Sequence, residues 1–158
     1  MKNFEYLSGY AVLFYRDFSS FTAAGLQEIG LNFGFLYPVL YVGKHPGCTQ
    51  GEMKEALKMD WGYCQRSVER LVKDGFMEKE KSGTERGWHL KLTGKGEQAF
   101  LISRKSFEEW DRKMLSCLSD AEREDLFSVL KKIGRAGIMS GVTRSKQRLE
   151  VKGENEDV

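Results

Sequence analysis

Residues 49–93, TQGEMKEALKMDWGYCQRSVERLVKDGFMEKEKSGTERGWHLKLT, decide the fold of this chain. The stretch opens with Thr49 and Glu52, a capping box in which each side chain can accept a hydrogen bond from the backbone N–H of the other residue. A short helix is therefore predicted to follow, with the inward residues Met53, Ala56 and Leu57. Lys58 and Met59 then make a turn.

A second helix follows from Asp60, a good N-cap residue, to Asp74, and Gly75 is the kind of residue that ends a helix. One side of this helix is apolar, because its spacings of four and three align Cys64, Val68 and Leu71. Another side, at spacings of three and four, carries Tyr63, Arg66 and Arg70. The helix is expected to pack on the first side and present the second.

Two short strands complete the stretch. Residues 76–81 and 88–92 read as a hairpin around the turn 82–87, which carries Arg86, and the inward positions are Met77, Leu90 and Leu92. Helix, turn, helix and hairpin in this order outline a winged helix-turn-helix. The predicted fold class is mainly α with a small β-hairpin.

The polar residues of this stretch are of the types that hold phosphates and read base edges in DNA. Arg66 is the strongest candidate, since a bidentate contact from arginine to guanine is the commonest specific contact. Thr49 and Gln50 start a helix, where backbone N–H groups can meet a phosphate. The full predicted set is Thr49, Gln50, Tyr63, Gln65, Arg66, Arg70, Lys81 and Arg86.

Several of these assignments have a purely structural alternative. Arg66 could pair with Glu69 or Glu55, Thr49 could serve only as a cap, and Lys81 could lie on a solvated strand edge. The charge of the chain does not decide, because its net value is only +2. Residues 44–96 carry eleven Lys or Arg against eight Asp or Glu, whereas residues 1–43 carry two against three. The basic excess therefore lies where DNA contact is predicted.

Helices are also predicted on both sides of this stretch. The apolar spacing indicates helices over 5–24 and 32–43, the latter with Asn32 as N-cap and Pro38 kinking or delaying it. A long helix is expected from Thr93 to about Cys117. A second capping box, Ser119 to Glu122, opens a helix that ends near Gly134 and buries Leu126, Val129, Leu130 and Ile133.

The chain favours a binding protein over an enzyme. No phosphate-cradling glycine motif, hydrolase triad signature or metal-ligand spacing is present, so we expect no catalytic residue, cofactor or metal. Three widely spaced cysteines, Cys48, Cys64 and Cys117, make no disulfide framework, and no leader or membrane segment is apparent. A cytoplasmic location is expected. Cys64 is assigned to the core, Cys48 lies in a loop where it could react, and Cys117 closes a helix.

The ordered landmarks resemble the MarR family of bacterial transcriptional regulators. They are Pro46 to Glu52, Asp60 to Leu71, Lys73 to Phe76, Arg86, and Leu92 to Gly96, and the resemblance covers about residues 5–135. It implies one domain over 1–139, with dimerisation helices at 5–43 and 94–135, a winged-helix lobe at 44–93 and a flexible tail at 140–158. Thr84 stands where the family wing usually has Asp, and Trp61-Gly62-Tyr63 stands where small hydroxyl residues are usual.

The resemblance also implies a function. It implies a homodimer that binds double-stranded DNA at a pseudo-palindromic operator, acting as a repressor that a small hydrophobic or phenolic effector releases. An effector pocket is expected among the aromatic residues near the chain start, at Tyr15, Phe18, Phe35 and Tyr37. Core and dimer packing is the alternative role for the same residues. The alternative functions are a winged helix that contacts only proteins and a regulator that senses oxidants through a thiol.

Overall fold

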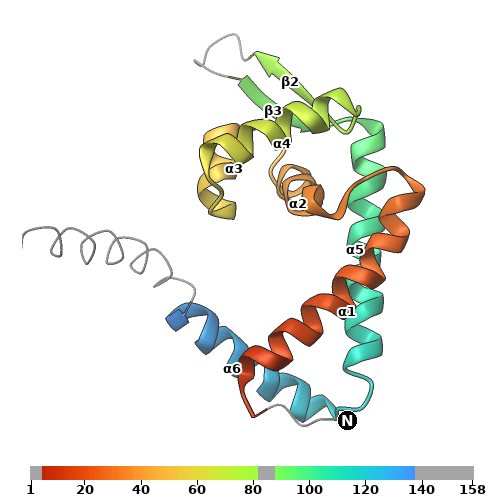
Figure 1. The fold of residues 1–158 in the computed structure, drawn as a ribbon, viewed down its shortest axis with the longest axis vertical. Coiled ribbons are helices and arrows are strands. Elements are labelled where there is room, and N and C mark those ends of the chain that lie inside the picture. The colour runs from red at the N-terminus through yellow and green to blue at the C-terminus, as the bar shows by residue number, and fades with distance from the viewer. Residues whose placement is uncertain (1–4, 82–87, 138–158) are drawn as a thin grey trace, which may run out of the picture. The chain divides into compact units, whose positions relative to one another are not determined.

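The computed structural model describes residues 5–81 and 88–137 (Figure 1). The chain divides into two compact units, Met1–Arg112 and Lys113–Val158. The predicted wing tip at 82–87, with Arg86, and the predicted tail at 140–158 lie outside the described residues. Within the described ranges, no helix is long and apolar enough to cross a membrane.

The first unit begins with α1 (Leu7–Glu28), which confirms the predicted N-terminal helix and extends it by one turn. The segment after it differs from the expected single helix. Asn32 caps a 3₁₀ turn, η1 (Phe33–Phe35), by accepting a 2.8 Å hydrogen bond from the Gly34 N–H. The helix α2 (Leu36–Lys44) then follows. Pro38 lies in the first turn of α2, where its missing N–H removes no helical bond, so it delays the helix without kinking it.

The helix-turn-helix consists of α3 (Gln50–Leu57) and α4 (Trp61–Lys73). Both hydrogen bonds of the Thr49–Glu52 capping box are present, and Asp60 caps α4 through the Tyr63 N–H at 2.8 Å. Met53 is fully buried as predicted. Ala56 is exposed, so that prediction was wrong: the buried side of this two-turn helix is narrower than the spacing suggested.

The wing strands are β2 (Met77–Lys81) and β3 (Trp88–Leu92), within one residue of the predicted bounds. They pair antiparallel, with Met77 opposite Leu92 and Lys81 opposite Trp88. A third strand, β1 (Cys48–Thr49), was not predicted; it pairs with the other edge of β3, which gives the order β1-β3-β2. The residues just before α3 are therefore fixed to the wing.

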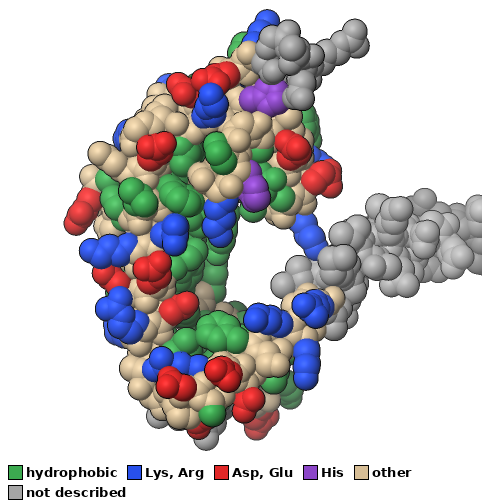
Figure 2. Space-filling model, turned by 180° about the vertical axis from the view of Figure 1, so that it is seen from behind, with side chains coloured by type: hydrophobic (Ala, Val, Ile, Leu, Met, Phe, Trp, Pro, Cys, Tyr) green, Lys and Arg blue, Asp and Glu red, His purple; other side chains and the backbone are tan. Residues whose placement is uncertain are grey.

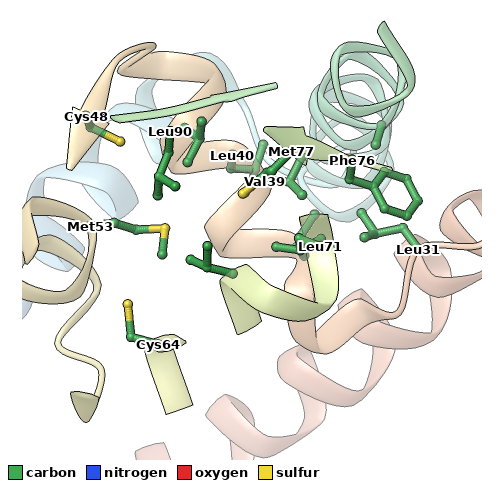
Figure 3. Packing of buried hydrophobic residues seen from close by; sticks show 14 of the residues in the cluster. Leu31, Val39, Leu40, Cys48, Met53, Cys64, Leu71, Phe76, Met77 and Leu90 are labelled. Atoms are coloured by element: carbon green, nitrogen blue, oxygen red, sulfur yellow. The ribbon is translucent and has the colours of Figure 1, made fainter. Parts of the chain in front are cut away.

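A single hydrophobic cluster holds α2, α3, α4 and the sheet together. Figure 3 shows the side chains converging from each element, among them Val39 and Leu40 from α2, Met53 from α3, Cys64 and Leu71 from α4, and Met77 and Leu90 from the wing strands. The predicted apolar side of α4 is confirmed, because Cys64, Val68 and Leu71 are all buried. The cluster orients α4 by its apolar side and leaves its polar side free.

The long helix α5 (Gly94–Met114) starts against this lobe. Thr93 Oγ1 accepts from the Gly96 N–H at 3.1 Å and donates to the Gly75 carbonyl, the residue that ends α4. Gly96 is needed for this close approach, since a Cβ there would lie 2.0 Å from the backbone oxygen of Phe76. Further along, Phe18 of α1 packs on Phe107 and Trp110, so α1 and α5 lie side by side (Figure 1).

The second unit contains α6 (Asp120–Gly137), which extends beyond the predicted end at Gly134. Its capping box is confirmed, with Glu122 accepting from the Ser119 N–H at 2.8 Å and Ser119 Oγ accepting from the Glu122 N–H. We predicted that this helix buries its apolar side, and in the single chain that prediction was wrong. Leu126 is half-buried, and Val129, Leu130 and Ile133 are exposed.

Candidate nucleic-acid interface

The exposed side of α4 is rich in polar groups. Its buried residues, Cys64, Ser67, Val68 and Leu71, lie on one side, and the exposed side presents Gln65, Arg66, Glu69, Arg70 and Lys73. Asp60 caps the N-terminus and Arg70 and Lys73 lie in the last turn, so the charges at both ends suit the helix dipole. On the face of the molecule that Figure 2 shows, acidic and basic side chains are interspersed, so charge by itself marks no contact surface on that face.

Arg66 is exposed and available for a new contact. Among the described residues, no carboxylate pairs with its guanidinium. The two partners considered from the sequence are engaged elsewhere, Glu69 with Gln65 at 3.0 Å and Glu55 with Lys54 at 2.5 Å. The Arg66 side chain folds back towards the start of α4, where its Nη1 lies 3.1 Å from the position that a Cβ on Gly62 would occupy.

Gly62 is a residue whose role the sequence did not reveal. In the sequence it is only a glycine that weakens a helix. In the structure it leaves the space that Arg66 occupies, next to the Asp60 carboxylate. The signal that could have identified it is the spacing of four between Gly62 and Arg66, which places the two on one side of a helix.

Gln65 and Arg70, also predicted to contact DNA, each have a partner on α4 or at its end. Gln65 Nε2 donates to Glu69, and Arg70 Nε lies 2.7 Å from Asp74 Oδ2. Arg70 and Asp74 form an exposed ion pair, which contributes little to stability, and the hydrogen bond from Gln65 to Glu69 is exposed as well. A phosphate or a base edge can therefore replace either carboxylate at small cost.

Tyr63 differs from the other predicted contacts because its hydroxyl is engaged inside the molecule. Tyr63 Oη donates to the Gly34 carbonyl at 3.0 Å, across 29 residues of sequence. The 3₁₀ turn η1 is thereby attached to the first turn of α4. Local sequence reasoning placed Tyr63 on the exposed side of the helix but could not find this partner.

Thr49 and Gln50, both predicted to contact DNA, lie at the N-terminus of α3. Bonds from the Thr49 backbone and hydroxyl hold the pKa of the Glu52 carboxyl below its ordinary value. The Gln50 side-chain nitrogen is buried and meets no hydrogen-bonding partner in the described ranges. The groups at this terminus that remain suited to a phosphate are backbone N–H groups, as the sequence suggested for Gln50.

At the wing, Lys81 is exposed at the end of β2, with its Nζ 5.1 Å from the ring centre of Trp88. Lys91 on β3 pairs with Glu80. Arg86, the predicted wing contact, lies in the segment that the structure does not describe. The described part of the wing therefore offers one exposed cation, Lys81, held over an aromatic ring.

The two cysteines within the winged-helix lobe, Cys48 and Cys64, are not suited to thiol chemistry. Cys64 is buried as predicted, and burial raises the pKa of its thiol. Cys48 was expected in a loop where its thiol could react, but it lies in β1, where burial and the nearby Glu52 carboxylate raise the pKa of the thiol to about 11. A thiol with a raised pKa stays protonated, and the thiolate is the reactive form. Cys117 is exposed.

The aromatic residues predicted to line an effector pocket are only partly brought together. Tyr15 and Phe18 both contact the ring of Phe33, at 6.3 and 5.9 Å between centroids. Burial, and then the nearby Tyr15, raise the pKa of Tyr37. Phe35 instead lines an open hollow of about 580 Å³ beside α4, together with Asn32, Tyr63, Arg66 and Arg70. No cluster of metal-ligating side chains occurs within residues 5–81 and 88–137.

A short helix, a solvent-facing second helix and an antiparallel wing define the first unit as a winged helix-turn-helix. Comparison with known proteins supports this class and indicates which family of it the chain belongs to. The chain is 42% identical to the HTH-type transcriptional regulator BilQ of Clostridium symbiosum over 127 residues, 80% of this chain and 88% of that protein. It is 26% identical to the BilQ of Clostridioides difficile over 128 residues, 79% of this chain and 86% of that protein. No protein-family profile matches the chain.

Solved structures share the fold. A MarR transcriptional regulator from Methanosarcina mazei matches with a TM-score of 0.75 at 20% identity, over 86% of this chain and 99% of that one. The S. aureus MepR–DNA complex matches with a TM-score of 0.75 at 18% identity, over 85% and 99%. The chain belongs to the MarR family of winged helix-turn-helix regulators.

Proposed function

We propose that this protein is a sequence-specific DNA-binding transcriptional regulator that works as a homodimer and represses transcription. The observation that carries the proposal is the polar side of α4, on which Arg66 is exposed and unpaired among the described residues. Arginine on an exposed helix suits the acceptor pair on guanine in the major groove. The BilQ relatives, which are transcriptional regulators, support the same function.

The homodimer is supported by apolar side chains that the chain leaves uncovered. The first half of α1 exposes Leu7, Val12, Leu13 and Phe14, and α6 separately exposes Phe127, Val129, Leu130 and Ile133. Exposed apolar surfaces of this kind indicate a protein contact. A second copy of the chain supplies the same surfaces and therefore covers them symmetrically. The symmetry then predicts a pseudo-palindromic operator with half-sites about one helical turn apart.

On this operator, α4 lies in the major groove with Arg66, Gln65 and Arg70 towards the DNA. The α3 N-terminus at Thr49 and Gln50 meets a phosphate, and Lys81 and Arg86 approach the backbone beside the wing. Most of the affinity then comes from phosphate contacts, so binding weakens steeply with added salt.

The effector part of the proposal rests on Tyr15 and Phe18, whose rings both contact Phe33, and on Tyr37 near Tyr15, whereas Phe35, also predicted for this pocket, lines the separate hollow beside α4. A hydrophobic or phenolic molecule that binds there lowers operator affinity and raises the melting temperature of the free protein. A panel of phenolic and lipophilic compounds tests this. If none changes either quantity, these residues serve packing alone.

The function itself is tested by binding the full chain to a pool of randomised DNA duplexes at near-physiological salt and sequencing the bound fraction. Enrichment of a pseudo-palindrome is the expected result, and transcription from a promoter carrying that sequence should fall when the protein is added. Absence of any enriched sequence overturns the proposal and favours a winged helix that contacts only proteins.

The role of Arg66 is tested on the enriched operator. Arg66→Ala should weaken operator binding by about 1–3 kcal/mol and relax the base preference at one position of each half-site. Arg104→Ala is the matched control, because Arg104 is an equally charged, exposed residue on α5 whose ion pair within the described residues is a long one, 3.7 Å to Glu108. Unchanged base preference in Arg66→Ala argues against base reading by this arginine.

A further inference from the structure

Two aromatic residues at the start of α4, Trp61 and Tyr63, differ in whether the side chain has a partner within the molecule. Trp61 is the first residue of the helix and leaves 54% of its surface exposed, whereas the Tyr63 hydroxyl is bound to Gly34. We infer that the two divide the work on DNA, which rests on the proposed function: Trp61 reads the methyl group of a thymine in the major groove, and Tyr63 is a positioning residue that reads no base.

The argument for Tyr63 is that both of its polar groups are already satisfied. Its backbone N–H is bound by the Asp60 carboxylate at 2.8 Å, and its hydroxyl donates to the Gly34 carbonyl at 3.0 Å. Gly34 is held from its other end as well, because its N–H donates to Asn32. A base contact in which the Tyr63 hydroxyl donates would have to break this bond, so we assign the hydroxyl to holding the first turn of α4 against the 3₁₀ turn η1.

Trp61 is suited to contact a thymine methyl group by its position at the helix N-terminus and by its exposed apolar ring. The N-terminal residues of a recognition helix are the ones that contact base edges. Trp61 lies one helical turn before Gln65, on the same side of α4. Among the described residues no aromatic ring or cation packs on its indole. The thymine methyl is the apolar group that the major groove presents to such a surface.

The test uses the full-length protein and the operator sequence enriched by the wild type. Each thymine in a half-site is replaced in turn by deoxyuridine, which removes one methyl group and keeps every hydrogen-bonding group. For the wild type, one replacement should weaken binding by about fourfold, the worth of one buried methyl group. In Trp61→Ala the same replacement should have no effect, because the group that contacts the methyl is gone.

Two variants make the result specific. Leu101→Ala removes an apolar side chain with 61% of its surface exposed on α5, a residue that takes no part in the proposed DNA contact, and it should keep the wild-type response to deoxyuridine. Tyr63→Phe should lower the affinity for all sequences alike while preserving every base preference.

The outcomes separate the inference from the function on which it rests. If the wild type enriches no sequence, the proposed function fails. If it enriches an operator but no deoxyuridine replacement depends on Trp61, methyl reading by Trp61 is wrong. If Tyr63→Phe relaxes the preference at a single base pair, Tyr63 reads DNA and its assignment as a positioning residue is wrong.

Discussion

The helices α4 and α6 are both amphipathic and both begin at a side-chain cap, but their apolar sides meet different surroundings. On α4, Cys64, Val68 and Leu71 are at most 1% exposed. On α6, Val129, Leu130 and Ile133 are 50%, 47% and 44% exposed. The amino-acid pattern of the two helices is equivalent, so the difference lies in what covers them. The winged-helix lobe buries its core within one chain, whereas α6 leaves these three side chains exposed, and we propose that a second copy of the chain covers them.

The largest effect is expected from truncating the core side of α4. Leu71→Ala should lower the free energy of unfolding by about 2–5 kcal/mol, because it removes a buried side chain and leaves a cavity. Urea unfolding at fixed protein concentration measures it. If the free energy of unfolding falls by less than about 0.5 kcal/mol, as for a typical surface substitution, then Leu71 does not belong to a well-packed core.

The corresponding change on α6 should act on association. Leu130→Glu places a charge in the proposed contact between copies and should raise the dissociation constant of the dimer by about a hundredfold, or about 2.8 kcal/mol. Sedimentation equilibrium measures it. Ser128→Glu is the control, since it adds the same charge to the same helix about 200° around its axis. Equal effects of both changes would mean that charge, not apolar contact, governs association.

A smaller effect is expected at the two capping boxes, which have the same chemistry in the two units. Thr49→Ala and Ser119→Ala each remove the hydroxyl that accepts from the third residue of the helix, at a cost of about 0.5–2 kcal/mol. Amide hydrogen exchange should show lost protection in α3 for the first variant and in α6 for the second. Loss of protection in both helices from either change would show that the two units unfold together.

The smallest effect is a dependence on pH. The pKa of Glu52 in the folded chain lies below its ordinary value because of its bonds from Thr49, so the ionised carboxylate stabilises the fold. This stabilisation is fully present above the unfolded pKa and is lost as the pH falls through the folded pKa. Glu52→Gln should therefore be less stable than the wild type at neutral pH, and equally stable in acid.

Glu122 provides the matched case on α6, because the bonds from Ser119 lower its pKa in the same direction. Glu122→Gln should follow the same pH course in the unfolding of α6 and leave the melting of the winged-helix lobe unchanged. A stability difference for Glu52→Gln that persists at acid pH would point to a packing role for this residue.

The parts of the fold that local chemistry determines could be predicted from the sequence. Both capping boxes, the Asp60 cap, the buried side of α4 and the bounds of the wing strands depend on residues close together in the chain. The strand β1 and the bond from Tyr63 to Gly34 join distant segments, and no local pattern encodes them. Cys48 was misplaced for the same reason, because its burial follows from pairing with Leu90. In the candidate site, the exposed position of Arg66 followed from helical spacing, while the space that Gly62 leaves for it did not.

The close approach at Gly96 has a consequence for genetics. A Cβ at this position would collide with a backbone oxygen, that of Phe76, and every residue carries the same backbone. A substitution at position 76 therefore cannot relieve the collision by making room. A selection for suppressors of a Gly96 replacement should recover restored glycine far more readily than compensating side-chain changes nearby.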